Sequence, residues 1–144
     1  NSHPSGIECV ELAHFYSFAL GNVVKYLWRA GLKGEAAWLV VDLEKARWYL
    51  NYARKESVLT HKRADYRIKA DCEDVLRKVL PHHNEAIAGV LTHITEALFC
   101  DNEDLYRALL ELALTKLHIE IARQQKPIVE GETETVVGPH GPSV

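Results

Sequence analysis

Apolar residues recur every three or four positions along most of the chain, the spacing that places them on one face of an α-helix. The clearest case is the stretch 35–56, where an apolar stripe steps by four and three residues. This stripe consists of Leu39, Leu43, Ala46, Leu50 and Ala53. Gly and Pro, which interrupt helices, are scarce before Pro127. The pattern predicts an all-α fold, a compact bundle of about five or six helices.

Capping and stop signals set the boundaries of these helices. Gly31 stands where a glycine ends a helix, and Pro81 cannot continue one. Asp101 or Asn102 can cap a last long helix that reaches about Gln125. The other predicted helices cover residues 7–15, 17–30, 35–56, 65–80 and 84–99.

The length of 144 residues favours one domain with its own core. We predict a single helical domain at 1–126, with a flexible or extended tail at 127–144 that lacks helical periodicity. The last predicted helix is apolar over more than half of its circumference, which is typical of a central helix or of an oligomer contact. We therefore expect a homo-oligomer.

The charge balance restricts the partners. The net charge of −3 comes from three Glu in the tail, so residues 1–126 carry 17 acidic and 17 basic side chains. A neutral body argues against duplex nucleic acid as a partner, although it leaves room for a small basic site. No apolar run is long enough for a membrane span, and no signal-peptide pattern is present. The chain has no Met, so we expect Asn1 not to be an initiator position.

Common catalytic and metal signatures are absent. There is no G-x-x-x-x-G-K-[ST], G-x-G-x-x-G, H-E-x-x-H or G-x-S-x-G motif. The eight His residues show no convergent spacing, so we interpret them as capping or solvated side chains and predict no metal centre. The three Cys lack a C-x-x-C motif and are expected to be buried free thiols in a reducing cytosol. No catalytic residue can be assigned.

Polar residues at helical spacing mark two consecutive predicted helices. Each run follows an i, i+3, i+7 pattern: Asn22, Lys25 and Arg29 on the first, and Asp42, Lys45 and Tyr49 on the second. Arg and Lys bind phosphate oxygens, and neighbouring aromatic rings can stack a base or form the walls of a site. These rings belong to Tyr26, Trp28, Trp48 and Tyr49. The alternative is a structural seam in which Arg29 pairs with Asp42 and the aromatic side chains fill the core.

Glu8 and Glu11 form an E-x-x-E on one helical face. Such a pair can bind Mg²⁺ beside a phosphate chain, as in helical nucleoside-triphosphate pyrophosphatases. The second acidic pair of those enzymes is missing here, because Leu39 stands three residues before Asp42. The alternative is ordinary helix-start acids, which the helix dipole favours.

Three runs carry a family resemblance: HPSGIECVEL, GNVVKYLWRAGLKG and DLEKARWYLNYA. The chain resembles a widespread family of small phage-encoded proteins of unknown function, often described as phage nucleotide kinase-like. The motifs are GIEC, G-N-x-x-K-Y-L-W-R-A-G and D-L-x-K-A-x-W-Y-L, and they cover about the first 55 residues. The family often has Tyr after the His, where this chain has Pro4. Residues 57–126 lie outside the motifs.

The resemblance implies a phage nucleotide-metabolism protein in the host-cell cytoplasm that binds a phosphorylated nucleoside. One branch of the family is credited with phosphorylating deoxynucleoside monophosphates without a P-loop. The residues that carry over as nucleotide-binding candidates are His3, Glu8, Asn22, Lys25, Arg29 and Lys45, with Asp42 beside them. Two alternatives stay open: a non-catalytic protein that sequesters a nucleotide or binds a host protein, and a Mg²⁺-dependent pyrophosphatase-like enzyme.

Overall fold

The computed structural model describes residues 3–30, 32, 36–61 and 65–125 of the chain. All secondary structure in these ranges is helical, which confirms the predicted all-α class. The elements are α1 (Cys9–Ala13), α2 (Phe18–Ala30), α3 (Ala36–Lys55), α4 (Val58–His61), α5 (Tyr66–Val79), the 3₁₀ turn η1 (Leu80–His82), α6 (Glu85–Leu98) and α7 (Glu103–Gln125). The predicted stop at Gly31 and the predicted tail lie outside the described residues.

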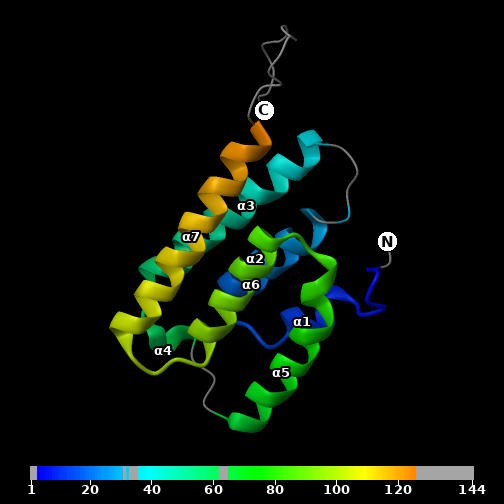
Figure 1. The fold of residues 1–144 in the computed structure, drawn as a ribbon. Coiled ribbons are helices and arrows are strands. Elements are labelled where there is room, and N and C mark those ends of the chain that lie inside the picture. The colour runs from blue at the N-terminus through cyan, green and yellow to red at the C-terminus, as the bar shows by residue number, and fades with distance from the viewer. Residues whose placement is uncertain (1–2, 31, 33–35, 62–64, 126–144) are drawn as a thin grey trace, which may run out of the picture.

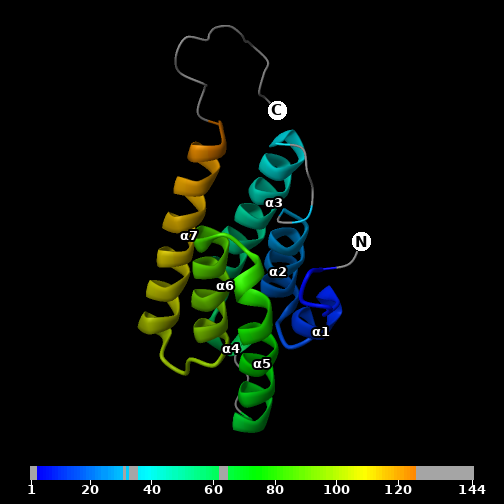
Figure 2. The same cartoon turned by 45° about the vertical axis from the view of Figure 1, so that its right-hand side comes forward.

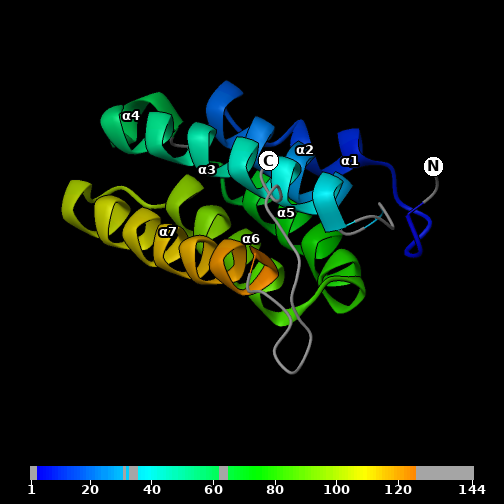
Figure 3. The same cartoon turned by 90° about the horizontal axis from the view of Figure 1, so that it is seen from above.

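The helices form two layers (Figure 1). Viewed from above, α1, α2 and α3 lie in one layer, and α5, α6 and α7 lie in the other (Figure 3). Within the layers α2 packs against α3, and α6 packs against α7; between them α7 contacts α3, α6 contacts α2, and α5 contacts α1 (Figure 2). The apolar faces of both layers therefore meet in one core.

The predicted cap at Asn102 is confirmed, and Asn84 forms a second cap in the same layer. The Asn84 side chain accepts a hydrogen bond from the Ile87 N–H at 2.8 Å, and the Asn102 side chain accepts one from the Leu105 N–H at 2.8 Å. Each bond satisfies an N–H group that the first turn of a helix leaves without a partner. The backbone stays helical past Pro81, as the 3₁₀ turn η1, because the missing N–H of proline is tolerated in the first turn of a helix.

Most of the predicted apolar stripe on α3 is buried. Leu43, Ala46, Leu50 and Ala53 are completely inaccessible to solvent, and Leu39 packs at the edge of the core. Helix α7 is different, because it buries one face and leaves Leu105, Leu112 and Ile119 at least half exposed. No helix in the described part of the chain is long and apolar enough to cross a membrane.

Two glycines of the family motifs have structural roles. Gly6 adopts a φ of +79°, in the left-handed region, and its N–H donates to the His3 carbonyl at 2.9 Å. A Cβ on Gly21 would lie 3.4 Å from the Ala13 carbonyl oxygen, so α1 crosses α2 closely at this point. These glycines fix the turn that begins at His3 and the position of α1 against α2.

Candidate functional site

Three cations from two helices gather around one aromatic ring. Lys25 Nζ, Lys45 Nζ and Arg29 Cζ lie 5.0, 5.5 and 5.8 Å from the centre of the Tyr26 ring. Helices α2 and α3 run in opposite directions here. Lys25 and Arg29 are four residues apart, so they lie on one face of α2, and this face is turned toward Lys45 on α3. Both lysines are exposed, and neither forms an ion pair with any described residue.

Below these cations lies a buried carboxylate. Asp42 is 1% exposed, and its Oδ1 lies 3.8 Å from Arg29 Nε, an ion-pair distance that is too long for a good hydrogen bond. Within the described residues, Asp42 Oδ2 and Arg29 Nε both lack a hydrogen-bond partner. A buried carboxylate with so few partners opposes folding. We call Lys25, Tyr26, Arg29, Asp42 and Lys45 the cationic seam.

The aromatic side chains divide between two places. The Tyr26 and Tyr49 rings stack with centroids 5.9 Å apart, and Trp48 meets Tyr49 edge-on at 5.0 Å. Trp28 is buried and does not reach the seam, contrary to its predicted place in the wall. The reason is helical geometry: residues two positions apart, such as Tyr26 and Trp28, point about 200° apart around a helix.

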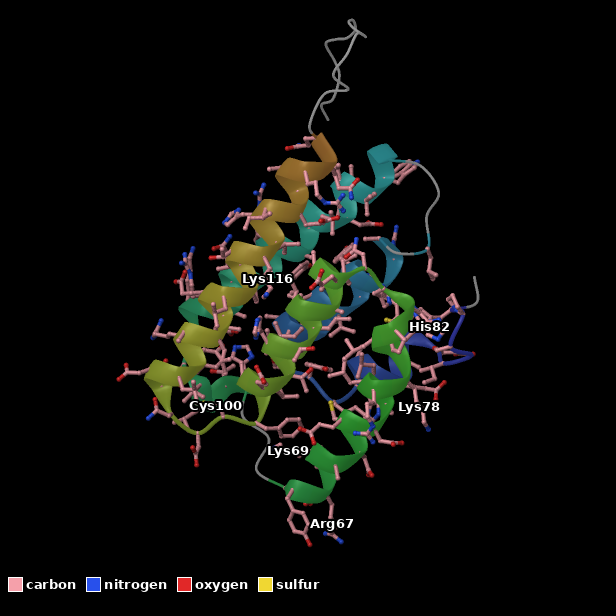
Figure 4. The ribbon with its side chains drawn as sticks, viewed as in Figure 1. Arg67, Lys69, Lys78, His82, Cys100 and Lys116 are labelled. Atoms are coloured by element: carbon pink, nitrogen blue, oxygen red, sulfur yellow. The ribbon has the colours of Figure 1, made fainter. Side chains whose placement is uncertain are left out.

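His3 belongs to a separate cluster with Trp28. Its ring lies 4.3 Å from the Trp28 ring, and His3 Nε2 lies 2.9 Å from His83 Nε2. His82 is the last residue of η1, next to the N-terminal segment, with its ring 5.6 Å from that of His3 (Figure 4). The predicted capping or solvated state is therefore wrong for His3, which is buried in a folded contact between distant segments.

The hydrogen bonds of this cluster fix its tautomers. His3 Nδ1 accepts from the Ser5 backbone N–H at 3.1 Å, so the proton of neutral His3 lies on Nε2 and points at His83 Nε2. His83 must then carry its proton on Nδ1, which is buried without a partner among the described residues. Burial lowers the pKa of His83 to about 4, with help from His3 and His82, and burial together with His82 also lowers the pKa of His3.

The remaining candidates border the seam or stabilise helices. Asn22 Nδ2 donates to the Phe18 carbonyl at 2.9 Å, within α2. Glu8 is the N-cap of α1, and its backbone N–H donates to Glu11 Oε2 at 2.9 Å as part of a capping box. This contact agrees with the helix-start interpretation of the acidic pair.

Cys9, the first residue of α1, lies near Lys25 of the seam. Burial raises the pKa of the Cys9 thiol, and the charge of Lys25 opposes that rise. Cys72 and Cys100 are buried, as expected, whereas Cys9 is partly exposed, and all three thiols are free.

The structure also shows a series of polar contacts around the buried His61 that the sequence did not indicate. Ser17 Oγ hydrogen-bonds His61 Nδ1, and His61 Nε2 lies 2.8 Å from Glu56 Oε1. These residue types occur in hydrolytic triads. His61 is completely buried, however, and its ring stacks on Tyr106. These contacts are better explained as a structural link between the start of α2, the end of α3 and α4. The residues that form them are up to 44 residues apart, and no local motif marks them.

No group of three or more His, Cys, Asp or Glu side chains in the described ranges is arranged to hold a metal ion. Residues 5–51 match the model of a family described as a protein of unknown function, DUF3310. The matched region contains α1, α2 and most of α3, and therefore the whole cationic seam. No curated protein and no solved structure matches the chain.

Proposed function

We propose that the cationic seam binds the phosphate of a phosphorylated nucleoside. The observation that carries the proposal is the convergence of Lys25, Arg29 and Lys45 on one ring, with a single buried acid below them. Like charges that gather in this way repel one another, and the repulsion is relieved when an anion lies between them. A purely structural seam would place an acid opposite each cation.

The charge of the seam fits a phosphate monoester. Three cations and one carboxylate give a formal charge of 3 − 1 = +2. A phosphate monoester carries about −1.5 to −2 at pH 7. Arg29 can donate two parallel hydrogen bonds to phosphate oxygens, and the flexible, exposed lysines supply point charges.

The aromatic side chains beside the cations suit the rest of a nucleotide. The stacked pair of Tyr26 and Tyr49 borders the phosphate site, and the Trp48 ring continues from Tyr49 toward solvent. A base bound beside the phosphate would meet an aromatic surface. Inorganic phosphate and sugars have no flat ring to stack on this surface and would gain less binding free energy from it. The proposed ligand is therefore a nucleotide rather than free phosphate.

The proposed site could only bind a nucleotide, or it could also transfer its phosphoryl group as a kinase does. Binding alone has more support. No hydrogen bond, ion pair or ring contact among the described residues links His3 or Glu8 to the seam, so neither is placed to orient a phosphoryl acceptor. The cations could still stabilise charge in phosphoryl transfer. A phage protein that sequesters a nucleotide in the host cytoplasm, or transfers its phosphate there, is the function we propose.

Calorimetric titration with each deoxynucleoside monophosphate, and with the matching nucleoside, tests the proposal. We expect the monophosphate to bind and the nucleoside to bind at least tenfold more weakly, because charge-assisted hydrogen bonds contribute about 1.5–3 kcal/mol each. Lys25→Ala and Lys45→Ala should each weaken binding of the monophosphate about tenfold.

Lys69→Ala is the matched control, since Lys69 is an exposed lysine on α5, in the other layer (Figure 4). Equal binding of nucleoside and monophosphate, or full binding by both seam variants, would refute the phosphate site. Product formation with an ATP donor in the same samples would select the kinase version, and binding without product would select sequestration.

A further inference from the structure

The aromatic rings next to the cationic seam continue along α3 as an exposed surface. Trp48 and Tyr52 stack with centroids 5.7 Å apart and planes inclined by 23°. Trp48 contacts Tyr49, and Tyr49 contacts both Tyr26 in the seam and Phe18 at the start of α2. We call Phe18, Trp48, Tyr49 and Tyr52 the aromatic platform.

The platform is open to solvent. Phe18 is 77% exposed, Trp48 61% and Tyr52 48%. Exposed aromatic side chains scattered singly need no explanation, but a connected group of them indicates a binding surface. Stacked rings present flat π-faces, which accept planar groups.

The two helices that carry the platform are basic. Together α2 and α3 contain six Lys or Arg and two acids, Asp42 and Glu44, a formal balance of 6 − 2 = +4. Asp42 is buried, and Glu44 lies 3.9 Å from Arg47. Arg47 and Arg54 contact His118 and Glu111 on α7, so they do not serve the platform. The positive charge next to the platform comes from Lys25, Arg29 and Lys45 of the cationic seam.

The platform extends beyond the space that one nucleotide fills. From Lys45 in the seam to Tyr52 the helix advances seven residues, which is about 10 Å at 1.5 Å per residue. Stacked bases are about 3.4 Å apart, so this distance accommodates about three of them. A single mononucleotide bound at the seam leaves part of the platform uncovered.

We infer that the platform stacks the bases of a short single-stranded nucleic acid whose phosphate lies on the cationic seam. This inference rests on the proposed function, since the same cations hold the phosphate. Alternating cations and exposed aromatic rings are the features by which proteins bind single strands without reading their sequence. A duplex hides the faces of its bases inside the helix, so it cannot use the platform.

Fluorescence anisotropy with 5′-labelled oligodeoxythymidylates of two, four and eight nucleotides tests the inference, with dTMP as competitor. We expect the four-nucleotide strand to bind about tenfold more tightly than dTMP, because stacking on aromatic side chains contributes about 1–3 kcal/mol per base. Trp48→Leu should remove most of this gain, and Trp48→Phe should retain it, since Phe keeps a flat ring.

Tyr66→Ala is the matched control, because Tyr66 is 78% exposed but lies on α5. If the four-nucleotide strand binds no better than dTMP, or if Trp48→Leu keeps the gain, the inference is wrong and the platform suits a protein partner instead. Failure of the proposed function has a different signature: Lys25→Ala then leaves the binding of dTMP and of every strand unchanged.

Discussion

At the residue scale, the contact between His3 and His83 makes stability depend on pH. His83 has a folded-state pKa of about 4, whereas a His in the unfolded chain titrates near 6.5. The unfolded state therefore binds more protons as the pH falls below 6.5, and the stability contributed by neutral His83 is lost between pH 6.5 and 4. Above pH 6.5 this contribution is fully present.

We expect His83→Gln to make the pH dependence of the unfolding free energy shallower. Between pH 7 and pH 4.5 the wild-type protein should lose about 2 kcal/mol more than the variant, a value reduced for partial solvent exposure. Urea titrations at both pH values measure this difference. His14→Gln, at an exposed position outside the cluster, is the control. Identical pH profiles for the wild type and His83→Gln would contradict the assignment.

Part of the site could be predicted from residue spacing. The i, i+3 and i, i+4 intervals of Lys25, Arg29, Asp42 and Lys45 place these side chains together whenever α2 lies beside α3. The contact between His3 and His83 spans 80 residues, and no helical period carries information over that distance. The same holds for the contact between Ser17 and His61.

At the scale of elements, the starts of the long helices could be predicted from the sequence, whereas the short helix α4 could not. Asn84, Asp65 and Asn102 precede their helices as N-caps with side-chain hydrogen bonds. Helix α4 has four residues, about one turn, so it contains no repeat that a periodicity argument can detect. The first predicted helix, at 7–15, is shorter in the structure because Glu8 caps it and α1 ends at Ala13.

Helix α7 has an outward face with a heptad pattern. Leu105, Leu112 and Ile119 recur every seven residues, and each is at least half exposed. Glu111, which Arg54 contacts, and Lys116 are exposed residues on opposite rims of this face. Their spacing of five residues brings opposite charges together when two parallel copies pair. We therefore expect a dimer through α7.

Light scattering coupled to size exclusion should give twice the 16.3 kDa chain mass. The double change Leu112→Lys and Ile119→Lys should give a monomer with little change in melting temperature, because both side chains point to solvent. Leu59→Lys, at an exposed position on α4, is the control. A wild-type mass of one chain at all concentrations would rule out this contact.

At the scale of the whole molecule, the two-layer arrangement leaves the seam at the edge of the core, since Tyr26 packs against the core and both seam lysines are exposed. The apolar faces of α2 and α3 turn toward α6 and α7, the exposed Lys25 and Lys45 point to solvent, and Asp42 is buried between these two regions. The all-α class could be predicted from the scarcity of Gly and Pro and from the helical spacing of the apolar residues. The stacking of α7 on α3 did not, because it depends on which apolar faces fit together.

The charge of the molecule is unevenly distributed along the chain. Helices α2 and α3 have a formal charge of +4 in a body of zero net charge, so the rest of residues 1–126 is negative. Arg47 and Arg54 face α7, whereas Lys25, Arg29 and Lys45 gather at the seam. We expect the affinity of the proposed anionic ligand for the seam to fall as salt screens these charges.

Asp42→Asn distinguishes an anion site from a structural salt bridge most directly. The change removes the one acid of the seam and raises its formal charge from +2 to +3. The measurement is the dissociation constant of a nucleoside monophosphate, together with the urea-derived free energy of unfolding. We predict severalfold tighter binding and a change in stability of less than about 1 kcal/mol, because the buried carboxylate has few partners. Unchanged or weaker binding, with stability lower by about 3 kcal/mol or more, would show that the seam serves only to hold the two helices together.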